Sequence, residues 1–202
     1  MNFKNNKYLA DRFLIDKVLS GDTNAFKAII KNTEGLVTQI IFKMIPNKED
    51  RKDIAQDIYL KTFQNLGTFN FQSKLSTWIG QIAYNTCINY LEKKKLVLLD
   101  NKNDSKKSDE ESLEMLDSKV DYFKSETEER IHKKELSELL EAEINKLTPV
   151  YKTLITLYHN EELNYSEIAG ITELPIGTVK NYLFRARKIL RDNLWFTYKK
   201  EE

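Results

Sequence analysis

The sequence predicts an all-α protein with two small helical domains joined by a flexible acidic linker. Turn-forming residues are scarce: 6 Gly and 3 Pro among 202 residues disfavour sandwiches, barrels and glycine-looped nucleotide folds. In both halves, apolar residues recur at the spacing of amphipathic helices. Between them, residues 101–114 (NKNDSKKSDEESLE) contain one apolar residue and cannot bury enough surface to become ordered. We therefore expect domains at residues 1–99 and 129–202, with the linker at residues 100–128.

The N-terminal half is expected to hold four helices, at residues 8–19, 24–45, 49–66 and 76–95. Asp22 is a suitable cap for the second helix, Pro46 ends it, and Gly67 closes the third. Apolar side chains mark the faces of the first and third helices. Leu9, Phe13, Val18 and Leu19 lie roughly on one side of the first, and Ile54, Ile58, Phe63 and Leu66 are expected to face inward in the third.

The C-terminal half is also expected to hold four helices, at residues 128–146, 149–159, 165–171 and 176–198. Pro149 suits a first helical position, because its missing N–H needs no partner there. Asn164 followed by Glu167 at the third helical position forms a capping-box pattern. The last two helices, a short one and a longer one separated by a tight turn, have the pattern of a helix-turn-helix.

The last helix has two unlike faces. Val179, Leu183, Ala186 and Leu190 form a buried stripe at helical spacing. The opposite face carries Lys180, Asn181, Phe184, Arg185 and Lys188, which suit base edges and phosphates in a major groove. The amides of residues 176–178, at the positive end of the helix dipole, suit a phosphate. A solvated basic surface is the alternative, but a large apolar side chain among these charges favours DNA contact.

Charge is distributed unevenly along the chain, although the net charge is only +1. Residues 1–95 hold 15 basic and 9 acidic residues (net +6), and residues 96–148 hold 9 and 15 (net −6). Residues 149–202 hold 8 and 7 (net +1). This asymmetry suggests a polyanion contacted at two places, with solvated helix faces as the alternative.

Several classes of protein are disfavoured. A single Cys excludes an internal disulfide, and no Cys/His cluster could hold structural zinc. No apolar run reaches the ~18 residues of a membrane span, and the first residues do not read as a secretory signal. No nucleophile–base spacing, phosphate-binding glycine loop or metal constellation is present. We therefore expect a cytoplasmic protein that is not an enzyme and uses no cofactor or metal.

Two segments resemble one family. The segment ELNYSEIAGITELPIGTVKNYLFRARKIL resembles the region 4.2 helix-turn-helix of bacterial RNA polymerase sigma factors. The segment EDRKDIAQDIYLKTFQNLGTFNFQSKLSTWIGQIAYNTCINYLEKKK resembles region 2 of the same family. The order of the two segments and the absence of other regions resemble the extracytoplasmic-function (ECF) type of the sigma-70 family. The resemblance implies a sigma factor that directs core RNA polymerase to specific promoters for transcription initiation. Its C-terminal helix-turn-helix would read the minus-35 element, and its N-terminal domain would melt and capture the minus-10 element.

The resemblance also implies roles for individual residues. Residues that would read the minus-35 element are Thr178, Lys180, Asn181, Phe184, Arg185 and Lys188. Residues that would capture a single-stranded minus-10 element are Asn70, Lys74, Trp78, Gln81, Tyr84 and Asn85. We interpret Trp78 as mainly structural and Asn85 as the better base contact. Lys93, Lys94 and Lys95 could hold nearby phosphates.

Partners follow from the same resemblance. Asp53, Gln56 and Asp57 match the helix that binds the coiled coil of the largest polymerase subunit; a metal pair without a third ligand and a solvated acidic face are the alternatives. The polymerase flap and an anti-sigma factor are further expected partners. The acidic linker either threads toward the RNA exit path or is simply a linker. A helix-turn-helix regulator that works without polymerase remains the alternative function.

Two residues raise specific questions. The family often has Gly in the helix-turn-helix turn where this chain has Glu173, and a non-Gly residue in a left-handed conformation costs roughly 1 kcal/mol. A differently shaped turn is therefore expected. Cys87 is expected to be a buried thiol, with a redox sensor as the alternative.

Overall fold

A computed structural model describes residues 3–100 and 126–200, and these residues form helices connected by short loops. All eight predicted helices are confirmed, with ends that differ from the predicted ones by a few residues. The linker prediction falls mostly on residues 101–125, which lie outside the described residues. The elements are α1 (Phe3–Leu19), α2 (Thr23–Met44), α3 (Asp50–Asn65), η1 (Leu66–Thr68), α4 (Leu75–Asp100), α5 (Glu126–Lys146), α6 (Pro149–His159), α7 (Tyr165–Thr172) and α8 (Ile176–Lys200).

Local sequence signals set several helix starts. The Asp22 carboxylate accepts the Asn24 amide at 2.9 Å and so caps α2. Pro149 occupies the start of α6, as predicted. The capping box of α7 is complete: Asn164 Oδ1 accepts the Glu167 amide at 3.0 Å, and Glu167 Oε2 accepts the Asn164 amide at 3.0 Å.

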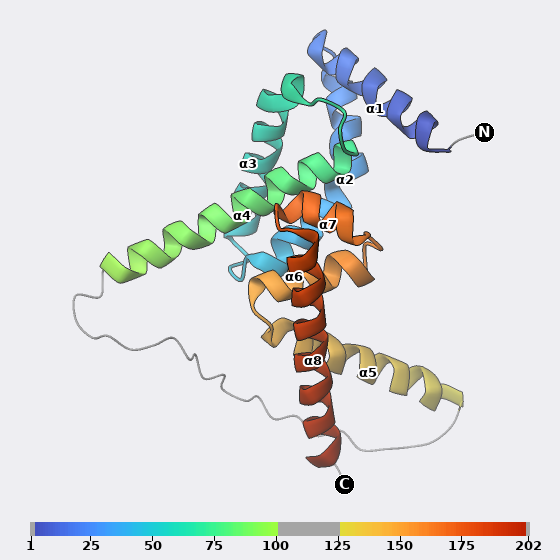
Figure 1. The fold of residues 1–202 in the computed structure, drawn as a ribbon, viewed down its shortest axis with the longest axis vertical. Helices are drawn as coiled ribbons and strands as arrows, with labels where there is room; N and C mark the ends of the chain where they lie inside the picture. Colours follow the sequence, from blue (N-terminus) through green and yellow to red (C-terminus); the bar gives the residue numbers. More distant parts are fainter. Residues whose placement is uncertain (1–2, 101–125, 201–202) are drawn as a thin grey trace.

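In the N-terminal unit, α1, α3 and α4 pack around α2 (Figure 1). Its centre consists of aliphatic side chains that are almost fully removed from solvent. Each such side chain stabilises the fold by about 1.5–3 kcal/mol relative to an exposed position. The largest of them are Ile29, Ile40, Met44, Ile45, Ile58, Leu66 and Ile79.

Two parts of the predicted core are different in the structure. Val18 is buried together with Ile15, but Leu9, Phe13 and Leu19 are exposed, because α1 meets the bundle along a narrow strip at one end (Figure 1). The inward prediction for Phe63 was wrong, since 48% of its surface is exposed. Ile58 and Thr62 take the inward positions of α3, which leaves Phe63 at the rim with its ring 5.1 Å from that of Phe26, edge to face.

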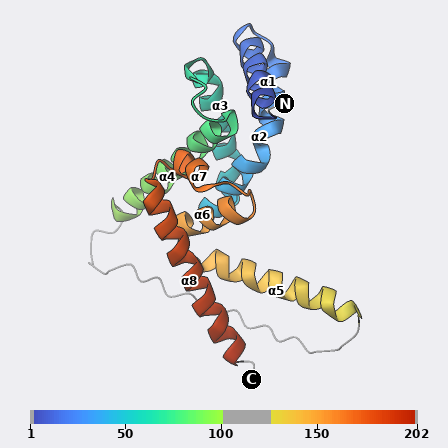
Figure 2. The same ribbon diagram turned by 45° about the vertical axis from the view of Figure 1, so that its right-hand side comes forward.

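The C-terminal unit is built on α8, against which α5, α6 and α7 pack (Figure 2). The predicted stripe of α8 is confirmed: Val179, Leu183 and Ala186 are fully buried and Leu190 nearly so. Ile168 and Ile171 of α7 are also fully buried, and Ile171 lies against Gly80 of α4.

The two units pack against each other, which the sequence did not predict. α7 lies on α4, and α6 lies on α2 (Figures 1 and 2). Lys43 of α2 also pairs with Glu141 of α5. The outer face of α8 remains exposed in this arrangement, so the helix predicted to read DNA is not buried.

Among the described residues, no helix is long and apolar enough to cross a membrane. Within the same residues, no group of three or more His, Cys, Asp or Glu side chains is placed to hold a metal ion. In the part of the chain that the structure describes, the acidic pair Asp53 and Asp57 therefore has no third metal ligand beside it.

Candidate nucleic-acid interface

The outer face of α8 carries the predicted minus-35 residues. Thr178 is half-buried beside them at the start of the helix. Phe184 is 68% exposed, so most of its surface is open to solvent. The first-turn amides of α8 have no partner within the helix, and the dipole adds positive potential there. The exposed members are Lys180, Asn181, Phe184, Arg185 and Lys188.

Three residues that the sequence analysis did not include, Tyr158, Tyr165 and Arg187, extend this face. Tyr158 of α6 and Tyr165 of α7 stack with ring centroids 5.2 Å apart. The Arg187 guanidinium lies 4.8 Å from the centroid of Tyr158, and Lys180 Nζ lies 5.6 Å from that of Tyr165. Burial and the neighbouring Arg187 lower the pKa of His159. Helical spacing placed Arg187 near the basic face, but nothing in the sequence showed its partners on α6.

The loop before α4 carries Asn70 and Lys74 from the predicted minus-10 set. Asn70 is exposed, and its Oδ1 accepts the Gln72 amide at 3.2 Å. Phe71 has φ 59°, a left-handed conformation that is strained for an aromatic residue. Its ring packs against Phe69 at 4.8 Å, and the Arg12 guanidinium lies 5.9 Å from its centroid. These contacts hold a turn that presents Asn70 to solvent.

Two aromatic members of the minus-10 set serve packing. Trp78 is half-buried, with its ring 5.3 Å from that of Phe69, as expected for a mainly structural residue. Tyr84 is only 5% exposed, and burial raises the pKa of its hydroxyl. The face open to a ligand is therefore narrower than the six predicted residues suggest.

The two amides of the set meet an acid from the other unit. Gln81 Nε2 donates to Glu173 Oε1 at 2.7 Å, and Asn85 Nδ2 donates to Glu173 Oε2 at 2.7 Å. One carboxylate from the helix-turn-helix turn thus occupies both amides.

Glu173 is the residue that replaces the family's Gly in this turn. It adopts the left-handed conformation itself, with φ 56° and ψ 19°. The turn therefore keeps the left-handed residue that a Gly would supply, and the chain accepts roughly 1 kcal/mol of backbone strain. The expectation of a differently shaped turn is not met at this residue.

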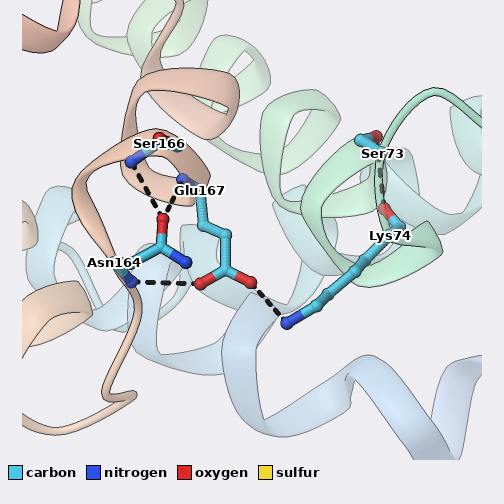
Figure 3. A network of polar contacts seen from close by, with 5 residues as sticks. All are labelled: Ser73, Lys74, Asn164, Ser166 and Glu167. Atoms are coloured by element: carbon cyan, nitrogen blue, oxygen red, sulfur yellow. Dashed lines mark hydrogen bonds and ion pairs between the residues drawn. The ribbon is translucent and has the colours of Figure 1, made fainter. Parts of the chain in front are cut away.

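Lys74 is also held by the C-terminal unit. Its ammonium pairs with the carboxylate of Glu167, which at the same time completes the cap of α7 with Asn164 (Figure 3). Lys74, Gln81 and Asn85 are thus all bound to acids of α7 or of the turn that follows it.

A second surface lies on α3. Asp53 and Gln56 are exposed, and Asp57 pairs with Lys61 of the same helix at 2.7 Å. Beside them runs an apolar groove of about 510 Å³ between α2 and α3, which the sequence analysis missed. The sequence signal that could have revealed the groove is the number of apolar residues on α3, which exceeds what its buried side holds: Leu60 and Phe63 are left exposed. The groove is lined by Phe26, Ile30, Lys52, Ala55, Gln56, Tyr59, Leu60 and Phe63.

Cys87 is fully buried in α4, as predicted. Burial raises the pKa of its thiol to about 12, so the reactive thiolate is scarce at neutral pH. The sensor alternative gains no support from this environment.

Comparison with known proteins identifies the family. Residues 29–97 match the family described as Sigma-70 region 2, and residues 137–190 match Sigma-70, region 4. The ECF RNA polymerase sigma factor SigW of Bacillus subtilis is 33% identical over 180 residues, which cover 89% of this chain and 94% of SigW. The chain belongs to the ECF sigma factors. The sigma-E factor of Escherichia coli is 30% identical over 183 residues, covering 90% and 93% of the two chains.

Solved structures agree with this sigma factor in fold. CnrH, in complex with the cytosolic domain of CnrY, has a TM-score of 0.59 at 19% identity, covering 92% of this chain and 97% of CnrH. The sigma factor RpoE, in complex with the anti-sigma factor NepR from Bartonella quintana, has a TM-score of 0.60 at 20% identity, covering 84% and 96%. The family matches place region 2 before region 4 along the chain, as predicted.

Proposed function

We propose that this sigma factor directs core RNA polymerase to promoters through two DNA-reading faces. The exposed face of α8 reads a duplex minus-35 element, and the loop 70–74 with the first half of α4 captures a single-stranded minus-10 element. The observation that carries this proposal is the placement of Phe184, Arg185 and Lys188 on an open face above a fully buried stripe. A helix of this kind fits the major groove, where Arg and Asn bond base edges.

The acidic face of α3 and its groove are proposed to bind the coiled coil of the largest polymerase subunit. Asp53 and Gln56 supply polar contacts, while Leu60 and Phe63 offer exposed apolar surface in the adjoining groove. Charge around an apolar centre is the usual composition of a protein interface. Region 4 is proposed to contact the flap.

An anti-sigma factor is a further proposed partner. RpoE and CnrH, whose folds this chain shares, were each solved in a complex, RpoE with the anti-sigma factor NepR. An exposed apolar groove such as that between α2 and α3 is a suitable site for an amphipathic helix of such a partner.

Sigma factors are initiation factors rather than catalysts, and we propose the same for this chain. Its proposed partners, core polymerase and chromosomal DNA, also place its action in the cell interior.

Run-off transcription tests the proposal. Core enzyme with this chain should produce discrete transcripts from genomic templates, and core enzyme alone should not. Sequencing the transcript ends then gives the two promoter elements. If the chain binds specific duplex sites tightly by itself but never directs core enzyme to initiate, it is a helix-turn-helix regulator and the proposal fails.

A further inference from the structure

We propose that Glu173 is an intramolecular latch that competes with single-stranded DNA for the minus-10 face of this protein's own α4. The inference rests on the proposed function of that face. It adds a specific competitor for that face, which is the turn of the helix-turn-helix. It also adds a closed state in which the face of α8 can bind DNA while the minus-10 face of α4 cannot.

The first step is the chemistry of the contact. Glu173 offers two carboxylate oxygens, and one accepts from Gln81 while the other accepts from Asn85, each at 2.7 Å. A side-chain amide N–H that donates to this carboxylate cannot donate to a base edge at the same time. The latch thus occupies one of the two N–H donors of each amide and places a carboxylate over the face that base capture needs.

The second step is the charge of the face. Lys74, the cation of the predicted minus-10 set, pairs with Glu167 (Figure 3). Glu167 thus neutralises the cation of this face, and Glu173 adds a negative charge beside Gln81 and Asn85. Like charges in such positions repel the ligand, so the closed state opposes DNA both by contact and by potential.

The third step is the fit between the backbones. A Cβ at Gly80 of α4 would lie 3.1 Å from Ile171 Cδ1, so the absence of a side chain lets α7 approach closely. On the other side, a Cβ at Gly170 would lie 3.2 Å from Thr77 Cγ2. The close approach of α7 covers the first half of α4 and positions the turn above Gln81.

The fourth step is that the contact is reversible. Glu173 is exposed, and its two partners are half-exposed, so water competes for these hydrogen bonds and their net strength is modest. Full opening also exposes the apolar contact of Ile171 with α4, so the carboxylate supplies only part of the free energy that holds the two units together. A closed population lowers the apparent affinity of the face in proportion to the fraction that is open.

The choice of Glu at position 173 supports a role beyond turn formation. Its left-handed backbone is strained, and Gly would relieve that strain without changing the turn. The side chain that creates the strain is the one that holds Gln81 and Asn85.

The test variant is Glu173→Gly in the full-length chain. It removes the carboxylate and at the same time favours the left-handed turn, so the helix-turn-helix stays folded. Glu162→Gly is the matched control, since Glu162 is an exposed acid with φ 53° in the loop before α7 and takes no part in the contact with α4. Glu173→Gln, which keeps the size but removes the charge, should give a smaller change in the same direction.

Two measurements are made on these proteins. Fluorescence anisotropy follows binding to a labelled pool of randomised single-stranded 12-mer DNA. Energy transfer between dyes on Gln64→Cys and Asn160→Cys, two exposed positions in different units, follows opening in a Cys87→Ser background. Glu173→Gly should lower the energy transfer and tighten DNA binding by about three- to tenfold, whereas Glu162→Gly should match the wild type.

A double variant shows where the gain arises. If the freed amides bind the DNA, adding Asn85→Ala to Glu173→Gly should remove most of the gain. Unchanged energy transfer in Glu173→Gly, or opening without tighter binding, would overturn the latch. A failure of the wild type to support run-off transcription would instead count against the proposed function, because the energy-transfer comparison needs no polymerase.

Discussion

The two helices that are expected to read DNA, α4 and α8, have opposite exposures in one molecule. α8 presents Phe184 and Arg185 to solvent, whereas α4 has Gln81 and Asn85 bound to Glu173. Both helices have a fully buried apolar side, so the difference lies in what contacts their outer sides. The comparison teaches that the same chain can keep one recognition surface ready while its own turn covers the other.

The largest expected effect compares neighbouring residues on α8. Leu183→Ala should lower the free energy of unfolding by about 2–5 kcal/mol, because Leu183 is fully buried. Phe184→Ala should change it by less than about 0.5 kcal/mol and weaken duplex binding instead. Urea unfolding followed by circular dichroism measures both. A large stability loss in Phe184→Ala would show that its ring is part of the core.

A third surface allows the comparison to be extended to polymerase binding. Asp53→Arg combined with Asp57→Arg should weaken association with core enzyme by about 2 kcal/mol or more. The two new cations would face a basic surface that is complementary to the original carboxylates, and like charges repel. Fluorescence anisotropy of labelled protein titrated with core enzyme measures this. Asp16→Arg with Glu92→Arg, two exposed acids elsewhere on the same unit, controls for net charge. Unaltered affinity in the first variant would remove polymerase docking from this face.

Arg185→Ala tests whether the α8 face is independent of the closed state. It should cost about 1–3 kcal/mol in minus-35 recognition if Arg185 contacts a base. The cost should be the same in a Glu173→Gly background, since α7 does not cover this side chain and distant changes add. Duplex-binding titrations of the four proteins provide the measurement, and an unchanged promoter profile would remove the role of Arg185.

The smallest expected effect on transcription concerns Cys87, which lies in the core and on neither DNA-reading face. With its pKa raised to about 12 by burial, the thiol stays protonated at pH 8, and its reaction with a disulfide reagent should be slower than in denaturant by a factor on the order of 1000. Absorbance of the released thiolate follows the rate. Fast modification of the folded protein with loss of transcription would revive the redox-sensor alternative.

Local patterns predicted the helices and their N-terminal caps well, but Gly67, predicted to close the third helix, lies inside the short 3-10 helix that follows α3. Asp22, Pro149 and the Asn164–Glu167 box act through neighbouring backbone groups, so residue type and spacing suffice to identify them. The stripe of α8 was predictable for the same reason, since a 3.6-residue period determines which side chains share a face.

Other features depend on which helices meet. Phe63 fits the apolar spacing of α3 but lies at the rim, because the position of α2 decides how wide the buried strip is. The groove beside it, and the ring of Tyr158 beneath Arg187, join residues that are distant in sequence.

The sequence by itself determined the two helical units, their order, and the face of α8 that remains for DNA, because these follow from periodicity, capping and motif. Only the tertiary structure decided that α7 covers α4 and that Glu173 binds Gln81 and Asn85. A hydrogen bond between residues 88 or 92 positions apart leaves no periodic signal, since it depends on how two separately folded surfaces fit together.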